Sequence, residues 1–218
     1  MLLLVIAFIS ILTLIHYKVI QVQIPLITPL ANWLLGSLEN WGQPPTLSNL
    51  SVPVLYFVLP VALLLLLGAR WREIGFGRGY RSWAVILPFS VPLLVLIVLK
   101  LVSGEKGLLI LLYLFIQNNL LNGFFEEFLF RGALMSRLNL LFGWSWGVEL
   151  ATLIFGLFHA PTYTAVFQGD LPAGIAYSLA NPVVFGLCFA IIVLRTRNLF
   201  ASSMIHALFN TCAMFVFG

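Results

Sequence analysis

The chain has 218 residues, of which 61% are apolar and 8% are charged, and its formal net charge is +4. Together with a mean hydropathy of +1.08, this composition excludes a soluble domain and indicates an integral membrane protein. The basic residues mostly fall in short segments between apolar runs. Because such a pattern sets membrane orientation, we predict no nucleic-acid partner and contact with the lipid bilayer along most of the chain.

Seven apolar runs are candidates for transmembrane helices, since a helix needs roughly 20 residues to cross the hydrocarbon core. They cover residues 1–17, 49–69, 83–102, 108–141, 147–167, 174–194 and 199–217. The first run has no signal-peptide cleavage pattern, so we expect it to be retained. The segment 19–48 is rich in Pro and Trp and predicts a short surface helix over 27–38. The predicted fold class is therefore all-α: one polytopic membrane domain, 1–218, with about seven transmembrane helices and a candidate interfacial helix.

Basic residues predict which loops share one side of the membrane. Seven spans place on one side the loops that carry Arg70, Arg72, Arg78, Arg81, Arg137, Arg195 and Arg197. By the positive-inside rule this side is predicted to be cytoplasmic.

Nine polar residues fall inside the predicted spans, where an ionisable group costs at least about 2.5 to 3.5 kcal/mol and usually marks function. They are Asn118, Asn119, Asn122, Glu126, Glu127, Arg131, His159, His206 and Asn210. Counted from the predicted cytoplasmic ends, the glutamate at 126 and the two histidines lie roughly 13 to 21 Å deep. We therefore expect them to share one layer of the bundle.

The two adjacent glutamates have different surroundings on a helical wheel. Glu127 and Arg131 are i,i+4 neighbours and can neutralise each other, which is a structural role. Glu126 is turned by about 100° and has no partner in its own helix. Asn122 and Asn119 lie on its face, a stripe that could simply hydrogen-bond neighbouring helices. An unpaired carboxyl is harder to explain in that way and is suited to proton transfer.

Two further i,i+4 pairs place side chains of this kind on separate spans. Phe155 can pack beneath His159, and Pro161 is expected to end or kink that helix, which favours a cavity beside the imidazole. His206 and Asn210 share a face of the last span. Ser202, one turn from His206, is interpreted as a helix-packing residue.

One free carboxyl, two imidazoles and a carboxamide suit hydrolysis, because a base can activate water and donors can stabilise an oxyanion. Two histidines and a glutamate could equally hold a catalytic zinc ion, although the HExxH spacing is absent. If a metal is bound, its candidate ligands are Glu126, His159 and His206. The residues alone do not decide between water activation with and without a metal.

The motifs EExxxR at 126–131, FxxxH at 155–159 and HxxxN at 206–210, in this order, resemble the CAAX protease and bacteriocin-processing family of intramembrane endopeptidases. The resemblance covers roughly 108–215. It implies that Glu126 and His159 activate water, while His206 and Asn210 complete the site and steady the oxyanion. Supporting roles fall to Glu127, Arg131, Phe155 and Asn122. The family has been described both as metalloproteases and as glutamate-type enzymes, so the resemblance leaves the metal open.

The resemblance implies cleavage of a membrane-associated peptide or protein, such as a C-terminal anchor, a CAAX-like tail or a bacteriocin precursor. We expect a multi-pass protein of a prokaryotic plasma membrane, with a catalytic core at 108–217 and accessory spans at 1–107. One alternative is a non-catalytic immunity or peptide-binding member of the family. Another is a proton-coupled transporter, which also uses buried Glu and His, although no internal repeat of interrupted helices is visible.

Overall fold

The structure is a computed structural model that describes residues 57–80, 82–104, 107–117 and 123–217. Within these ranges the chain is helical and contains no strand, so the all-α prediction is confirmed. The helices are α4 (Leu59–Leu66), η3 (Trp71–Ile74), α5 (Ser82–Val102), α6 (Leu108–Gln117), α7 (Phe124–Glu127), η5 (Phe128–Met135), α8 (Ser136–Phe158), α9 (Ala160–Val166), α10 (Leu171–Ala180), α11 (Pro182–Thr196), α12 (Leu199–Cys212) and η6 (Ala213–Phe217). The predicted first span, the candidate interfacial helix and the three asparagines at 118, 119 and 122 lie outside the described residues.

Four stretches of the described chain are long and apolar enough to cross a membrane. They are Trp83–Val102, Phe124–Val166, Leu171–Thr196 and Leu199–Val216. A multi-pass membrane protein is therefore confirmed, whereas the count of seven spans is not. The predicted run 49–69 is described only from residue 57, and its helix α4 has 8 residues.

The longest of these stretches folds back on itself at Gly143. This residue has φ 79° and ψ 169°, a left-handed conformation that glycine adopts without strain. Asn139 and Gly147 meet across the turn, where a Cβ on Gly147 would lie 2.8 Å from Asn139 Cα. Further along, the rings of Phe130 and Phe155 lie 5.1 Å apart. Phe124–Val166 is thus a helical hairpin whose turn falls between the predicted runs 108–141 and 147–167.

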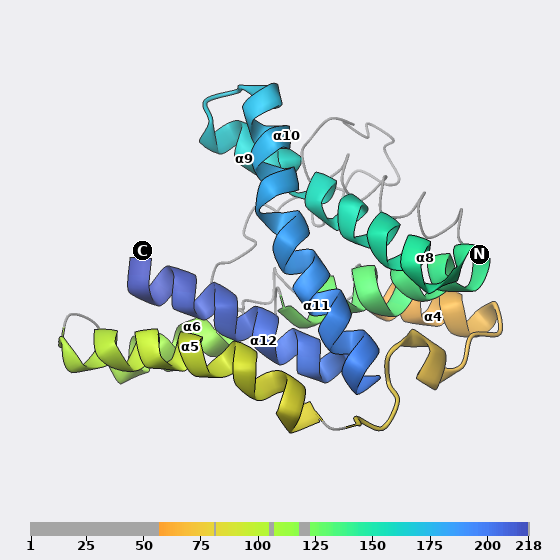
Figure 1. Cartoon of the computed structure of the whole chain (residues 1–218), viewed down its shortest axis with the longest axis horizontal. Helices are drawn as coiled ribbons and strands as arrows, with labels where there is room; N and C mark the ends of the chain where they lie inside the picture. The colour runs from red at the N-terminus through yellow and green to blue at the C-terminus, as the bar shows by residue number, and fades with distance from the viewer. Residues whose placement is uncertain (1–56, 81, 105–106, 118–122, 218) are drawn as a thin grey trace, which may run out of the picture.

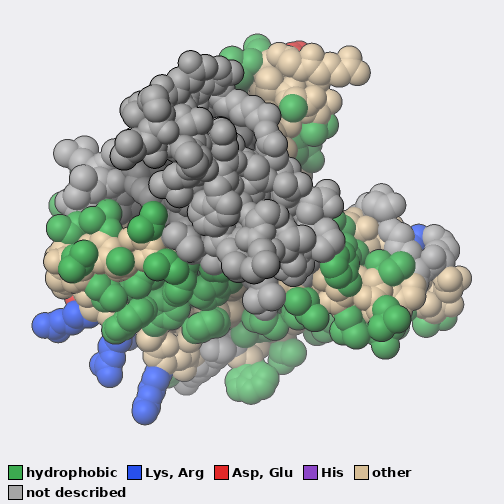
Figure 2. Space-filling view, turned by 180° about the vertical axis from the view of Figure 1, so that it is seen from behind, with side chains coloured by type: hydrophobic (Ala, Val, Ile, Leu, Met, Phe, Trp, Pro, Cys, Tyr) green, Lys and Arg blue, Asp and Glu red, His purple; other side chains and the backbone are tan. Residues whose placement is uncertain are grey.

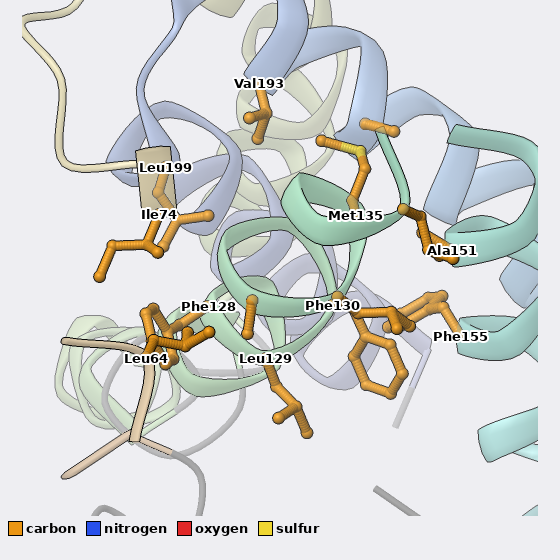
Figure 3. Close-up of a cluster of buried hydrophobic side chains, with 14 of the residues drawn as sticks. Leu64, Ile74, Phe128, Leu129, Phe130, Met135, Ala151, Phe155, Val193 and Leu199 are labelled. Carbon is orange, nitrogen blue, oxygen red and sulfur yellow. The ribbon is translucent and has the colours of Figure 1, made fainter. Parts of the chain in front are cut away.

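The largest hydrophobic core surrounds η5, whose Phe128, Leu129 and Phe130 are completely buried. Figure 3 shows side chains from α4, η3, α8, α11 and α12 converging on this segment. η5 has π-helical hydrogen bonding, a form of helix that often occurs at functional sites. Residues of 57–80 therefore share a core with the predicted catalytic segment.

α5 and α6 lie alongside α12, α11 crosses α12, and α9 and α10 form a hairpin that projects at one end (Figure 1). At the opposite end the basic loops meet. Asn198 Nδ2 donates to Gly77 O at 3.0 Å, and Arg137 Nη2 lies 3.6 Å from Glu73 Oε2. Figure 2 shows basic side chains gathered at one edge of a largely hydrophobic surface. The loops predicted to share one side of the membrane do lie together.

Candidate active site

Glu126 lies on α7 and is buried, with 8% of its surface exposed. Its Oε2 is buried without a hydrogen-bond partner among the described residues. The same oxygen lies 3.7 Å from His159 Nε2 and 3.8 Å from His206 Nε2, which is beyond direct hydrogen bonding. The fold therefore brings together one residue from each of the three sequence motifs, around an unpaired carboxylate oxygen.

His159 is fixed at the junction between α8 and α9. α8 ends at Phe158 and α9 begins at Ala160 with Pro161 in its first turn, so the prediction that Pro161 interrupts this helix is confirmed. His159 Nδ1 lies 2.8 Å from Phe155 O. Because a carbonyl oxygen can only accept, we assign the ring hydrogen to Nδ1. The Phe155 ring packs edge-on at 4.6 Å, and Nε2 is left facing Glu126.

Glu127 is completely buried and holds three partners. Its Oε1 lies 3.1 Å from Arg131 Nη1, so the predicted i,i+4 ion pair is confirmed. The same oxygen accepts a hydrogen bond from His206 Nδ1 at 2.9 Å, and Ser202 Oγ donates to Oε2 at 2.5 Å. Glu127 therefore neutralises Arg131 and also orients the second imidazole.

Ser202 is completely buried between helices, as expected of a helix-packing residue, and its hydroxyl also satisfies a buried carboxylate. Its position one turn before His206 on α12 was the signal that could have identified it. α11 contributes two groups that no motif indicated. Arg131 Nη2 donates to Gly186 O at 2.9 Å, and the Phe189 ring stacks on His206 at 4.5 Å.

Asn210 is half-buried one helical turn beyond His206. Its side chain makes no hydrogen bond with the part of the chain that the structure describes. The predicted supporting residue Asn122 lies outside the described residues.

Three hydrogen-bond acceptors face one another at the centre of the site. Both histidines donate through Nδ1, so in their neutral form each Nε2 is an acceptor, and the unpartnered Oε2 of Glu126 faces them. Three acceptors that face one another at this distance are stable only when a donor or a positive charge lies between them. A water molecule, an added proton or a cation could supply it.

The side-chain types match the two-histidine, one-glutamate ligand set of some catalytic zinc sites. Tetrahedral zinc with bonds of about 2.1 Å places its ligand atoms about 3.4 Å apart, closer than the 3.7 and 3.8 Å found here. Across the described ranges, no group of three or more His, Cys, Asp or Glu is arranged to hold a metal ion. If a metal is bound, Glu126, His159 and His206 would hold it after a small movement of these side chains toward one another.

Fold and site together define a polytopic α-helical membrane protein with a buried carboxylate and imidazole centre. Residues 108–212 match the family model of the Type II CAAX prenyl endopeptidase, Rce1-like. This segment therefore belongs to the Rce1-like CAAX protease family, and the family resemblance drawn from its motifs is confirmed. No curated protein and no solved structure matches the chain.

Proposed function

We propose that the protein is an intramembrane endopeptidase that hydrolyses a peptide bond with a water molecule activated by Glu126. The observation that carries this proposal is the unpartnered, buried Oε2 of Glu126, which faces two imidazoles whose other nitrogens are already fixed. A carboxylate in a site shielded from bulk solvent is a general base of the kind that peptide hydrolysis requires.

The reacting water lies between Glu126 Oε2 and the two Nε2 atoms and donates its two hydrogens to two of these three acceptors. Its oxygen bonds to the carbonyl carbon of the substrate while Glu126 takes one proton. The carbon–nitrogen bond then breaks, and the same proton passes to the leaving nitrogen, which gives a free amine and a free acid. Glu126 is ionised again once the proton has passed to the leaving nitrogen.

Two side chains of α12 are proposed to stabilise the oxyanion. His206 donates through Nε2 when it is protonated, and the carboxylate of Glu127 balances that charge from the other side of the ring. Asn210, one turn away, supplies an amide donor. Glu127 acts through His206 and is a positioning residue, and Arg131 keeps Glu127 in place.

The family match and the membrane setting support a membrane-associated peptide or protein as the substrate. We expect a peptide bond near its hydrophobic end to reach the site formed by α7, α8 and α12. We propose a C-terminal anchor, a CAAX-like tail or a bacteriocin precursor as substrate, in a prokaryotic plasma membrane.

The test is Glu126→Gln, which keeps the shape of the side chain and removes the base. Cleavage of candidate substrates co-expressed from neighbouring genes should fall at least about 100-fold, with unchanged membrane insertion and melting temperature. Glu149→Gln is the matched control, because Glu149 is exposed on α8. Undiminished cleavage by Glu126→Gln would overturn the proposal.

A further inference from the structure

A cavity of about 560 Å³ opens at the end of the molecule where the basic loops meet. Its walls come from η3, η5, the first turns of α8 and the C-terminal end of α11. Three guanidinium groups line it, those of Arg72, Arg131 and Arg197. Arg72 and Arg197 are exposed and Arg131 is buried, so two of the charges lie at the mouth and the third lies at the inner end.

The cavity has an excess of positive charge. Glu127 neutralises Arg131, and Glu73 accepts a hydrogen bond from the backbone N–H of Arg70 and lies 3.6 Å from Arg137. By contrast, Arg72 and Arg197 have no ion-pair partner in the described part of the chain. Arginine binds phosphate through two parallel N–H donors, so two free guanidinium groups beside one cavity favour a phosphate ligand.

The hairpin turn at Gly143 locates this cavity relative to the bilayer. Its apolar side chains are largely exposed, with Trp144 at 65% and Trp146 at 63%. Exposed tryptophans next to apolar side chains are typical of the headgroup level of a membrane. Trp144 also lines the cavity, and Val193 and Leu194 give it an apolar wall. The cavity therefore combines a cationic mouth with apolar walls at the depth where lipid phosphates lie.

We propose that this cavity binds the phosphate group of a membrane glycerophospholipid and favours an anionic headgroup. The guanidinium groups of Arg72 and Arg197 hold the phosphate, and the wall formed by Trp144 and α11 contacts the apolar part of the lipid. Arg131 links the cavity to the site described above, because it holds Glu127. A bound lipid is thus expected to stabilise the folded protein.

The experiment measures binding of phosphatidylglycerol to the full-length protein in detergent, by native mass spectrometry and by the rise in melting temperature. The variant is Arg72→Gln/Arg197→Gln. The charge-matched control is Arg78→Gln/Arg195→Gln, because both of these arginines are exposed and neither lines the cavity. We expect the dissociation constant to rise at least 10-fold in the variant and to change less than 2-fold in the control. Phosphatidylcholine should bind more weakly than phosphatidylglycerol to the parent protein.

Three outcomes would overturn the proposal. Equal weakening in the variant and the control would show general surface attraction. No weakening in either would place the lipid elsewhere. Binding of inorganic phosphate that depends on Arg72 and Arg197, without a matching dependence for phosphatidylglycerol, would show a site for a free anion. The measurement involves no peptide cleavage, so its failure is distinguishable from failure of the proposed function.

Discussion

Replacing Glu127 with glutamine should destabilise the protein strongly, because it removes one charge of a buried pair. Arg131 is only 3% exposed, and its Nη1 lies 3.1 Å from the Glu127 carboxylate. Removing one partner of such a pair costs about 3–5 kcal/mol, since the remaining charge stays buried without compensation. In a chain of this size about 1 kcal/mol lowers the melting temperature by about 2–4 °C. We therefore expect Glu127→Gln to lower it by about 6–20 °C.

The same substitution should also reduce catalysis. On the helical wheel alone, Glu127 points away from the face that carries Glu126. In the structure, its hydrogen bond with His206 Nδ1 connects it to the candidate active site. A neutral amide cannot balance a protonated imidazole, so oxyanion stabilisation through Nε2 weakens. We expect kcat to fall about 100-fold at a temperature where the variant is still folded.

Thermal unfolding in detergent and a cleavage assay test both effects, with Glu149→Gln as the control for an exposed glutamate. The double variant Glu127→Gln/Arg131→Gln should be more stable than the sum of the two single losses predicts, because it leaves no uncompensated charge. A melting temperature equal to that of the parent, or fully additive losses, would refute the reasoning.

Ser202→Ala removes the hydroxyl that donates to Glu127, so it should cost about 1–3 kcal/mol of unfolding free energy; an unchanged thermal unfolding curve would contradict the hydrogen bond. Gly147→Ala should lower the melting temperature, because its Cβ would lie 2.6 Å from the backbone nitrogen of Asn139. The control is Gly107→Ala, whose Cβ would meet no atom within 4 Å. Equal effects of the two substitutions on the melting temperature would argue against the hairpin. Chelators should leave cleavage unchanged after dialysis into metal-free buffer; activity that is lost and then restored by added zinc would show that the histidines and the glutamate rearrange around a metal.

The sequence predicted the helical class and the convergence of three motifs because both follow from local rules. Apolar runs must be helical in a bilayer, and buried charges must find partners or mark a function. The pairing of Glu127 with Arg131 was predictable for the same reason, since i,i+4 neighbours meet on any helix. The family match at 108–212 agrees with the segment that the motifs indicated.

The environment of the site was not predictable from local spacing, because it depends on how α11 packs against α8 and α12. Gly186 and Phe189 lie in an apolar run without a motif, yet one binds Arg131 and the other stacks on His206. The link between Glu127 and His206 is likewise tertiary, because 79 residues separate the two in sequence. For this reason the wheel gave Glu127 a structural role and could not detect its contact with His206.

The charges of the buried side chains connect the ion pair between Glu127 and Arg131 with the candidate active site around Glu126. Glu126 and Glu127 contribute two negative charges, and Arg131 contributes one positive charge. A net negative charge in a buried site is costly, so the site needs one more positive charge or hydrogen-bond donor. Such a group would also supply the donor that the three converging acceptors lack. Since Arg131 already compensates Glu127, we expect this group to lie between Glu126, His159 and His206.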